Sequence, residues 1–198
     1  MDATNAQVEL KMQKKAVRKE ALGRRRGMTT AQRVAESKTI AERLLASEAF
    51  QQAKSVFVYV STEDEVHTGE LLQACLKSGK LLSVPFITDA KAGLMIAARL
   101  NNLDALEPGV FDILTVSKNK LEEILPENID LVIVPGAAFD SKRHRIGMGG
   151  GYYDRFLKLC RKAKRIALAY DCQIYTALPV ENHDQGIDAI YTGHHIFK

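Results

Sequence analysis

Two continuous apolar runs, residues 55–60 (SVFVYV) and 130–134 (DLVIV), constrain the fold of this chain most. Runs this short and rich in β-branched residues are typical of strands buried on both faces of a sheet. Between residues 71 and 76 apolar side chains recur at helical spacing, Gly79 stops the pattern, and the next apolar run covers residues 81–84. A strand, a helix and a strand in this order predict a parallel pair with a right-handed crossover.

The same alternation continues along the chain. We expect the strand at residues 81–84 to end at Pro85 and residues 135–144 to form a polar loop. The other expected elements are helices over residues 7–26, 30–50, 120–125 and 151–162, and strands over residues 94–98, 165–170 and 187–192. The 198 residues contain no repeat or linker, and this length suits one hydrophobic core. We therefore predict a single α/β domain over residues 1–198, a three-layer α/β/α sandwich with a mostly parallel, Rossmann-like sheet.

The composition argues against several classes of protein. No run of 18 or more apolar residues occurs, and the N-terminal segment lacks the apolar stretch of a signal peptide. Cys75, Cys160 and Cys172 are too few and too widely spaced for a disulfide framework or a zinc site. We therefore expect a cytoplasmic protein with no membrane partner, and we expect it to be a monomer.

Positive charge is concentrated near the N-terminus. Nine of the 28 Lys and Arg residues lie between positions 11 and 33, where Glu20 is the lone acid. This pattern fits either an anionic partner or a solvated helix face. A nucleic-acid-binding module is one alternative, and its affinity would fall steeply with added salt. No aromatic residues are interleaved with these basic residues, so we favour a phosphate-bearing small molecule and expect no nucleic acid.

The segment Arg145 to Asp154 (RIGMGGGYYD) carries the strongest chemical signal. Four glycines in five residues, directly before a helix, let backbone N–H groups approach an anion, and the helix N-terminus adds its positive end. Arg145 can donate two parallel hydrogen bonds to a phosphate, and Asp154 is placed to hold Mg²⁺ beside phosphates. The segment therefore predicts a site for an anionic, phosphate-bearing ligand at the carboxyl end of a strand.

Known phosphate motifs do not account for this segment. No Gly-Lys-Ser/Thr follows, and Tyr152 stands where the dinucleotide fingerprint needs its third glycine. A tight turn without a ligand is one alternative. A sugar-phosphate isomerase or an acyl-transfer enzyme is another, but such enzymes need a catalytic carboxylate or lysine in the anion loop, where Tyr152 and Tyr153 stand.

The chain resembles the 5-formyltetrahydrofolate cyclo-ligase family, also called 5,10-methenyltetrahydrofolate synthetases. The hallmark is a strand ending in Pro-Gly, then Ala/Gly-Phe-Asp and a glycine-rich Arg-to-Asp stretch, matched by residues 134–140 and 145–154. Further landmarks match at residues 14–18, 64–68 and 181–188, so the resemblance covers nearly the whole chain. It implies ATP-dependent ring closure of 5-formyltetrahydrofolate to 5,10-methenyltetrahydrofolate, by phosphoryl transfer to the formyl oxygen, with release of ADP and phosphate.

The resemblance also implies roles for particular residues, with Arg145 and Tyr153 as the catalytic pair. Folate would be bound by Tyr59, Val60, Glu65, Met148, Gly149, Gly150, Gly151 and Tyr152, and Mg²⁺ by Asp154 and Asp188. ATP would be bound by Lys14, Lys15, Ala16, Val17, Arg18, Arg145, Ile146, Gly147, Met148, Gly149, Gly150, Gly151, Tyr152 and Tyr153. The chain departs from the family pattern at Phe86-Ile87, where a basic residue is usual, and at residues 111–116, where a Glu-Pro is missing.

Overall fold

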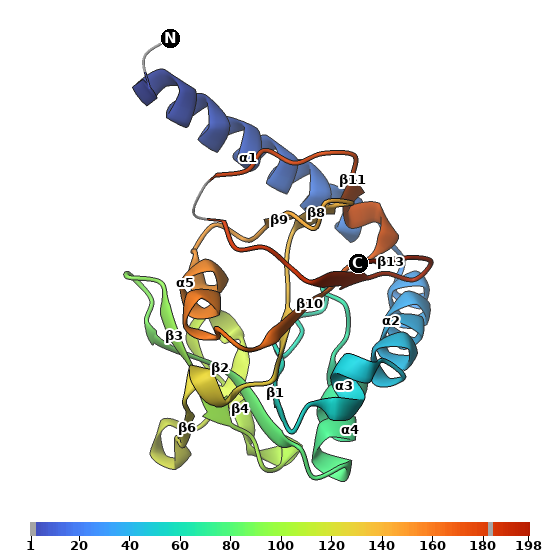
Figure 1. Ribbon diagram of the computed structural model, residues 1–198, viewed down its shortest axis with the longest axis vertical. Helices are drawn as coiled ribbons and strands as arrows, with labels where there is room; N and C mark the ends of the chain where they lie inside the picture. Colours follow the sequence, from blue (N-terminus) through green and yellow to red (C-terminus); the bar gives the residue numbers. More distant parts are fainter. Residues whose placement is uncertain (1–2, 182–183) are drawn as a thin grey trace.

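A computed structural model describes residues 3–181 and 184–198, arranged around an eight-stranded sheet (Figure 1). The strand order is β13-β12-β10-β7-β1-β2-β3-β6. These strands are β1 (Ser55–Phe57), β2 (Leu81–Asp89), β3 (Leu94–Arg99), β6 (Glu123–Ile124), β7 (Leu131–Val134), β10 (Lys164–Leu168), β12 (Ala189–Tyr191) and β13 (Ile196–Phe197).

The five central strands are parallel, and the outer strands are antiparallel. β1 pairs in parallel with β2 on one side and β7 on the other, and β10 pairs in parallel with β7 and β12. β3 and β6 complete one edge and β13 the other, all by antiparallel pairing. The expected mostly parallel, Rossmann-like sheet is therefore confirmed, and its parallel strands end at one common edge.

Helices cover both faces of this sheet. The helices are α1 (Ala3–Arg26), α2 (Thr30–Leu45), α3 (Glu48–Gln52), α4 (Gly69–Lys77) and α5 (Tyr152–Leu159). Successive residues of β1 face opposite layers: Val56 packs with residues of α2, α3 and α4, whereas Phe57 packs against Phe156 of α5. Both residues are fully buried, which confirms the expected three-layer arrangement.

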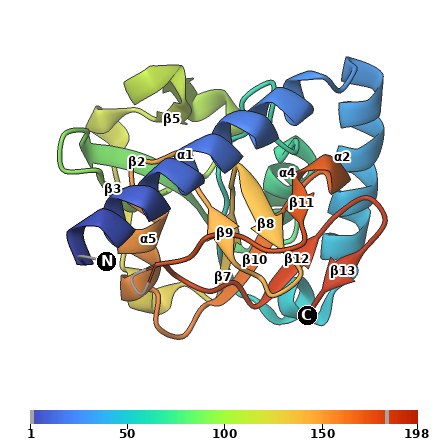
Figure 2. The ribbon, with the colours of Figure 1, turned by 90° about the horizontal axis from the view of Figure 1, so that it is seen from above.

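The long helix α1 lies across the carboxyl edge of the sheet, beside a small second sheet (Figure 2). This sheet has the order β11-β8-β9 and contains β11 (Ile174–Tyr175), β8 (Ala138–Asp140) and β9 (Arg145–Ile146). Ala21 of α1 packs there against Ala138 and Ile146, and all three are buried. The expectation of a loop over residues 135–144 is therefore wrong, because β8 and β9 form an antiparallel hairpin.

Other sequence expectations need correction. β2 runs through Pro85, because β1 pairs with β2 only as far as Ser83 and needs no N–H from the proline. The expected helix over residues 120–125 is replaced by a 3₁₀ turn and β6, where Ile124 is buried at the sheet edge. Three helices, not two, precede β1.

The remaining elements are short. β4 (Leu106–Pro108) and β5 (Leu114–Val116) form a two-stranded sheet. The 3₁₀ turns are η1 (Leu103–Ala105), η2 (Val110–Asp112), η3 (Lys118–Lys120), η4 (Pro126–Asn128) and η5 (Asp171–Gln173). Among the described residues, no helix combines the length and the apolar character needed to cross a membrane.

Candidate functional site

A cavity of about 540 Å³ lies at the carboxyl edge of the parallel strands. Tyr59 and Val60, beyond β1, and Pro135 and Gly136, beyond β7, line its base. α1, the glycine-rich segment and the segment that follows β4 contribute the walls. The cavity therefore lies where open α/β sheets bind their ligands.

The glycine-rich segment has a backbone that other residues would strain. Gly149 has φ +105° and Gly151 has φ +70°, both left-handed, and Gly151 is the N-cap of α5. A Cβ on Gly147 would lie 2.8 Å from Nη1 of Arg145. The segment therefore turns tightly against Arg145 before it enters α5, and it lines the cavity from Gly147 to Asp154.

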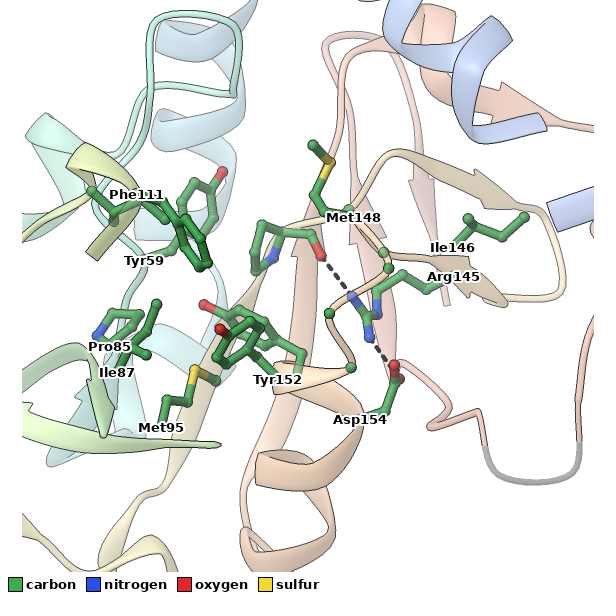
Figure 3. Close-up of a pocket in the computed structure, with 18 of the residues that line it drawn as sticks. Tyr59, Pro85, Ile87, Met95, Phe111, Arg145, Ile146, Met148, Tyr152 and Asp154 are labelled. Atoms are coloured by element: carbon green, nitrogen blue, oxygen red, sulfur yellow. Dashed lines mark hydrogen bonds and ion pairs between the residues drawn. The ribbon is translucent and has the colours of Figure 1, made fainter. Parts of the chain in front are cut away.

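Arg145 is buried and held in place at the start of this segment. Its Nη1 donates a hydrogen bond of 3.1 Å to the carbonyl of Pro135, and its Nη2 lies 2.6 Å from Oδ1 of Asp154 (Figure 3). Its guanidinium is 5.8 Å from the ring centre of Tyr153. Within the described part of the chain its Nε is buried without a hydrogen-bond partner. The cation is thus fixed at the cavity wall.

Two cations of α1 reach the same cavity, one helical turn apart. Arg18 donates from Nε to the carbonyl of Gly147 at 2.7 Å. Lys14 is buried, and its Nζ lies 2.8 Å from Glu181 and 2.5 Å from Asp184.

The expected segment of residues 14–18 therefore contributes its first and last members to the cavity. Lys15 and Ala16 are exposed, and Val17 packs against the cluster under α1, so these three do not line the cavity. The reason is helical geometry: Lys14 and Arg18, four apart, share the face toward the cavity. Lys15 and Ala16 face solvent, and Val17 faces the cluster under α1.

Tyr59 and Tyr153 line the cavity, and both carry buried hydroxyl groups. Tyr59 is buried and donates to the carbonyl of Val66 at 2.9 Å. The hydroxyl of Tyr153 is also buried, and no described residue accepts from it or donates to it. Burial raises the pKa of both well above the usual value, and the charge of Glu65 raises the pKa of both further. Both tyrosines are therefore neutral O–H groups at physiological pH.

The wall opposite Arg145 is apolar and was not foreseen from the sequence as part of a site. Figure 3 shows Pro85, Ile87, Met95 and Phe111 on the side of the cavity that faces Arg145 and Asp154. Phe111 is 66% exposed and has φ +60°, an unfavourable conformation for an aromatic residue. Ile87 and Phe111 lie in the two segments where the sequence departs from its family pattern, the only signal that could have pointed to them.

Glu65 also lines the cavity, near Tyr59 and Tyr153. Its Oε2 accepts hydrogen bonds from the backbone N–H and the hydroxyl of Thr62, both at 3.0 Å. The carboxylate therefore has a defined orientation in the loop between β1 and α4. The structure thus brings Tyr59, Val60 and Glu65 together with the glycine-rich segment, as the sequence led us to expect.

Asp188 does not join the site, and its expected pairing with Asp154 is wrong. Its Oδ2 accepts from the backbone N–H of Arg165 at 2.8 Å, and it is exposed directly before β12 begins. Since β10 and β12 are parallel, that position is the amino edge of the sheet, away from the cavity. Among residues 3–181 and 184–198, the carboxylates that line the cavity with Asp154 and Glu65 are Glu181 and Asp184.

The fold and this cavity define an α/β enzyme with a ligand site at the carboxyl edge of a parallel sheet. The profile of the 5-formyltetrahydrofolate cyclo-ligase family matches residues 10–193. The chain therefore belongs to the 5-formyltetrahydrofolate cyclo-ligase family, and the resemblance noted in the sequence is confirmed.

Individual relatives agree with this assignment. The 5-formyltetrahydrofolate cyclo-ligase of Mus musculus is 27% identical over 93% of this chain and 96% of its own length. The Escherichia coli K12 protein of the same name is 31% identical over 85% of this chain and 94% of its own length. The solved 5,10-methenyltetrahydrofolate synthetase of Aquifex aeolicus superposes with a TM-score of 0.82 at 29% identity, covering 93% of this chain and 92% of that one.

Proposed function

We propose that this enzyme closes the ring of 5-formyltetrahydrofolate to give 5,10-methenyltetrahydrofolate, using ATP and releasing ADP and phosphate. The observation that carries the proposal is that one cavity has two unlike walls. One wall holds a glycine-rich turn with Arg145 and Arg18, the facing wall is apolar, and Glu65 lines the cavity near Tyr59. The first suits a polyphosphate, and the second suits a flat heteroaromatic ring. The names of the Mus musculus and Escherichia coli relatives support the same reaction.

The reaction needs activation because a formyl oxygen is a poor leaving group. The γ-phosphoryl group of ATP passes to that oxygen and ADP is formed. The neighbouring anilino nitrogen of the folate then attacks the formyl carbon, the carbon–oxygen bond breaks, and phosphate leaves with the proton of that nitrogen. Such a transfer depends on positioning and on the neutralisation of charge more than on a protein nucleophile.

The side chains of the wall that holds the glycine-rich turn suit these demands. Arg145 and Arg18 bring fixed positive charge to the equatorial oxygens of the transferred group, and Lys14 adds a third cation. The buried hydroxyl of Tyr153 has no partner among the described residues, so it is available to donate to an anionic oxygen. Arg145 and Tyr153 are accordingly our catalytic candidates. None of the three cysteines, all of which the structure describes, lines the cavity, and burial raises the pKa of each, of Cys75 to about 11 and of Cys160 to about 12.

Magnesium fits this cavity only together with the nucleotide. The described part of the chain holds no group of three side chains that could bind a metal by itself. Mg²⁺ commonly uses one or two carboxylates plus phosphate oxygens, and Asp154 and Asp184 both line the cavity. We propose these two as its protein ligands. When bound, the ion neutralises charge on the transferred phosphoryl group.

Glu65 is our candidate for recognition of the pterin. A carboxylate can accept paired hydrogen bonds from the ring's exocyclic amine and the adjacent N–H. Tyr59 and Val60 border the same part of the cavity. The stretch from Met148 to Tyr152, part of the glycine-rich wall, would touch both substrates, and the formyl oxygen would then lie near the γ-phosphate.

The test is formation of the near-ultraviolet absorbance of the methenyl product from 5-formyltetrahydrofolate. We expect product with MgATP, and none without ATP or in excess EDTA. Full turnover in either control would contradict the ATP and metal requirement. Calorimetric titration with MgATP separates the alternatives, since a sugar-phosphate isomerase with this glycine-rich turn should not bind it. Absence of both product and MgATP binding would overturn the proposal.

A further inference from the structure

The loop that carries Glu65 is held by a chain of hydrogen bonds whose members lie outside the cavity. The hydroxyl of Tyr170, just beyond β10, donates to the carbonyl of Glu65 at 2.8 Å. The hydroxyl of Ser37, on α2, lies 3.1 Å from the hydroxyl of Tyr170 and accepts from the backbone N–H of His67 at 3.0 Å. Tyr170 and Ser37 are 0% and 3% exposed, so the chain is shielded from water.

The donor and the acceptor of each hydrogen bond in this series can be assigned in only one way. Tyr170 gives its single proton to the carbonyl of Glu65, so Ser37 must give its own proton to Tyr170. Ser37 in turn receives the N–H of His67. Each hydroxyl both donates and accepts, which strengthens its neighbours' bonds in a buried setting. Burial also raises the pKa of Tyr170, so its hydroxyl remains a donor at physiological pH.

A second set of contacts holds the next residues of the same loop. Tyr59 donates to the carbonyl of Val66 at 2.9 Å, and Thr68 donates from Oγ1 to the carbonyl of Tyr59 at 2.8 Å. The Glu65 carboxylate is oriented by Thr62. Each residue from Glu65 to Thr68 therefore makes a hydrogen bond to another part of the protein, although the segment has no regular secondary structure.

We infer that Tyr170 and Ser37 are positioning residues for Glu65, which set the place of its carboxylate in the cavity without touching a ligand. This inference rests on the proposed function, in which Glu65 recognises the pterin. Polar hydroxyls are costly in a hydrophobic core unless they are bonded, and here their bonds converge on one loop. A carboxylate that accepts hydrogen bonds from two donors at once must be placed accurately. A charge that acts only at a distance needs less exact placement.

Removal of the Tyr170 hydroxyl tests this role. We expect Tyr170→Phe to raise the Kd and the KM for 5-formyltetrahydrofolate about two- to tenfold, the worth of one net hydrogen bond. The Kd for ATP should not change, because the hydroxyl serves only the Glu65 loop. Tyr191→Phe is the matched control, since Tyr191 is also buried and outside the cavity, but among the described residues its hydroxyl makes no hydrogen bond to the Glu65 loop. Ser37→Ala should act as Tyr170→Phe does, and it replaces that variant if Tyr170→Phe does not fold.

A double-mutant cycle distinguishes positioning from general support of the fold. In a Glu65→Ala background no carboxylate remains to be placed, so Tyr170→Phe should no longer weaken folate binding. The same loss in both backgrounds would overturn the inference, as would an equal loss of ATP affinity. If the wild-type enzyme does not bind 5-formyltetrahydrofolate at all, the proposed function fails instead, and the two failures are thereby told apart.

Discussion

The guanidinium of Arg145 lies 2.6 Å from the carboxylate of Asp154, and both groups line the cavity. Asp154 stands in the first turn of α5, where a negative charge also meets the positive end of the helix. Only 3% of the Arg145 side chain is exposed, against 26% of the Asp154 side chain. The pair therefore holds the cation rigidly and leaves the carboxylate accessible from the cavity.

Replacement of Arg145 should damage nucleotide use. We expect Arg145→Ala to lower kcat/KM for ATP about tenfold to a hundredfold, which corresponds to about 1.5–3 kcal/mol for a charged hydrogen bond. Arg161→Ala is the control, because Arg161 is exposed and lies outside the cavity. Steady-state kinetics and thermal melting are compared for both variants. A lower melting temperature with unchanged ATP kinetics would show that Arg145 is a structural residue.

Two glycines, Gly151 and Gly23, should respond in opposite ways when each is replaced by alanine. Gly151 has φ +70°, so Gly151→Ala should cost about 1–2 kcal/mol of stability and weaken ATP binding. Gly23 lies inside α1 with nothing within 4 Å of an added Cβ, so Gly23→Ala should gain about 0.5–1 kcal/mol. Urea unfolding measures both changes. Equal effects at the two sites would argue against the strained turn.

Two aspartates near the C-terminus should differ in their link to magnesium. Asp184 lines the cavity, whereas Asp188 accepts from the backbone of Arg165 at the opposite edge of the sheet. Asp184→Asn should raise the Mg²⁺ concentration needed for half-maximal activity, and Asp188→Asn should leave it unchanged. The asparagine at 188 can still accept the backbone hydrogen bond, so little stability should be lost. The opposite pattern in a magnesium titration would restore Asp188 as the metal ligand.

Glu65 should serve the folate and not the nucleotide. Glu65→Gln keeps the size of the side chain but removes the charge and one acceptor. We expect 5-formyltetrahydrofolate to bind more weakly by about 1.5–3 kcal/mol while ATP affinity stays nearly constant. Separate calorimetric titrations measure the two affinities. Unaltered folate affinity, or tighter ATP binding as the main change, would place Glu65 on the nucleotide side.

The ion pair of His194 and Asp171 predicts a pH-dependent contribution to stability. Nδ1 of His194 lies 2.5 Å from Oδ2 of Asp171, and this hydrogen bond, with the charge of Asp171, raises the pKa of His194 above its usual value of 6.5. The interaction of protonated His194 with Asp171 therefore stabilises the fold fully below pH 6.5. This stabilisation is lost as the pH rises through the pKa of His194 in the folded state. His194→Gln should therefore lower the unfolding midpoint at pH 6 and leave it unchanged at pH 9.5. Equal losses at both pH values would mean that charge plays no part.

Several parts of the structure could be predicted because their signals are local. The apolar runs around Phe57 and Ile133 form buried strands, because a continuous run of apolar side chains by itself indicates a buried strand. The glycine-rich turn before α5 could also be predicted, because clustered glycines indicate left-handed backbone, which Gly149 and Gly151 adopt. The hairpin of β8 and β9 was missed because its strands are three and two residues long, too short for any periodic pattern.

What the sequence by itself determined is therefore the buried parallel strands, the glycine-rich turn and the family. Only the tertiary structure decided which distant residues meet at that turn. Phe111 and Ile87 became the facing wall because β2 and the segment after β4 pass beside the cavity, a relation between segments that no local pattern encodes. Asp184 and Asp188 are four residues apart in the chain, yet Asp184 lines the cavity at the carboxyl edge of the sheet and Asp188 lies at the amino edge. The point at which β12 begins, and the direction in which it runs, separates them.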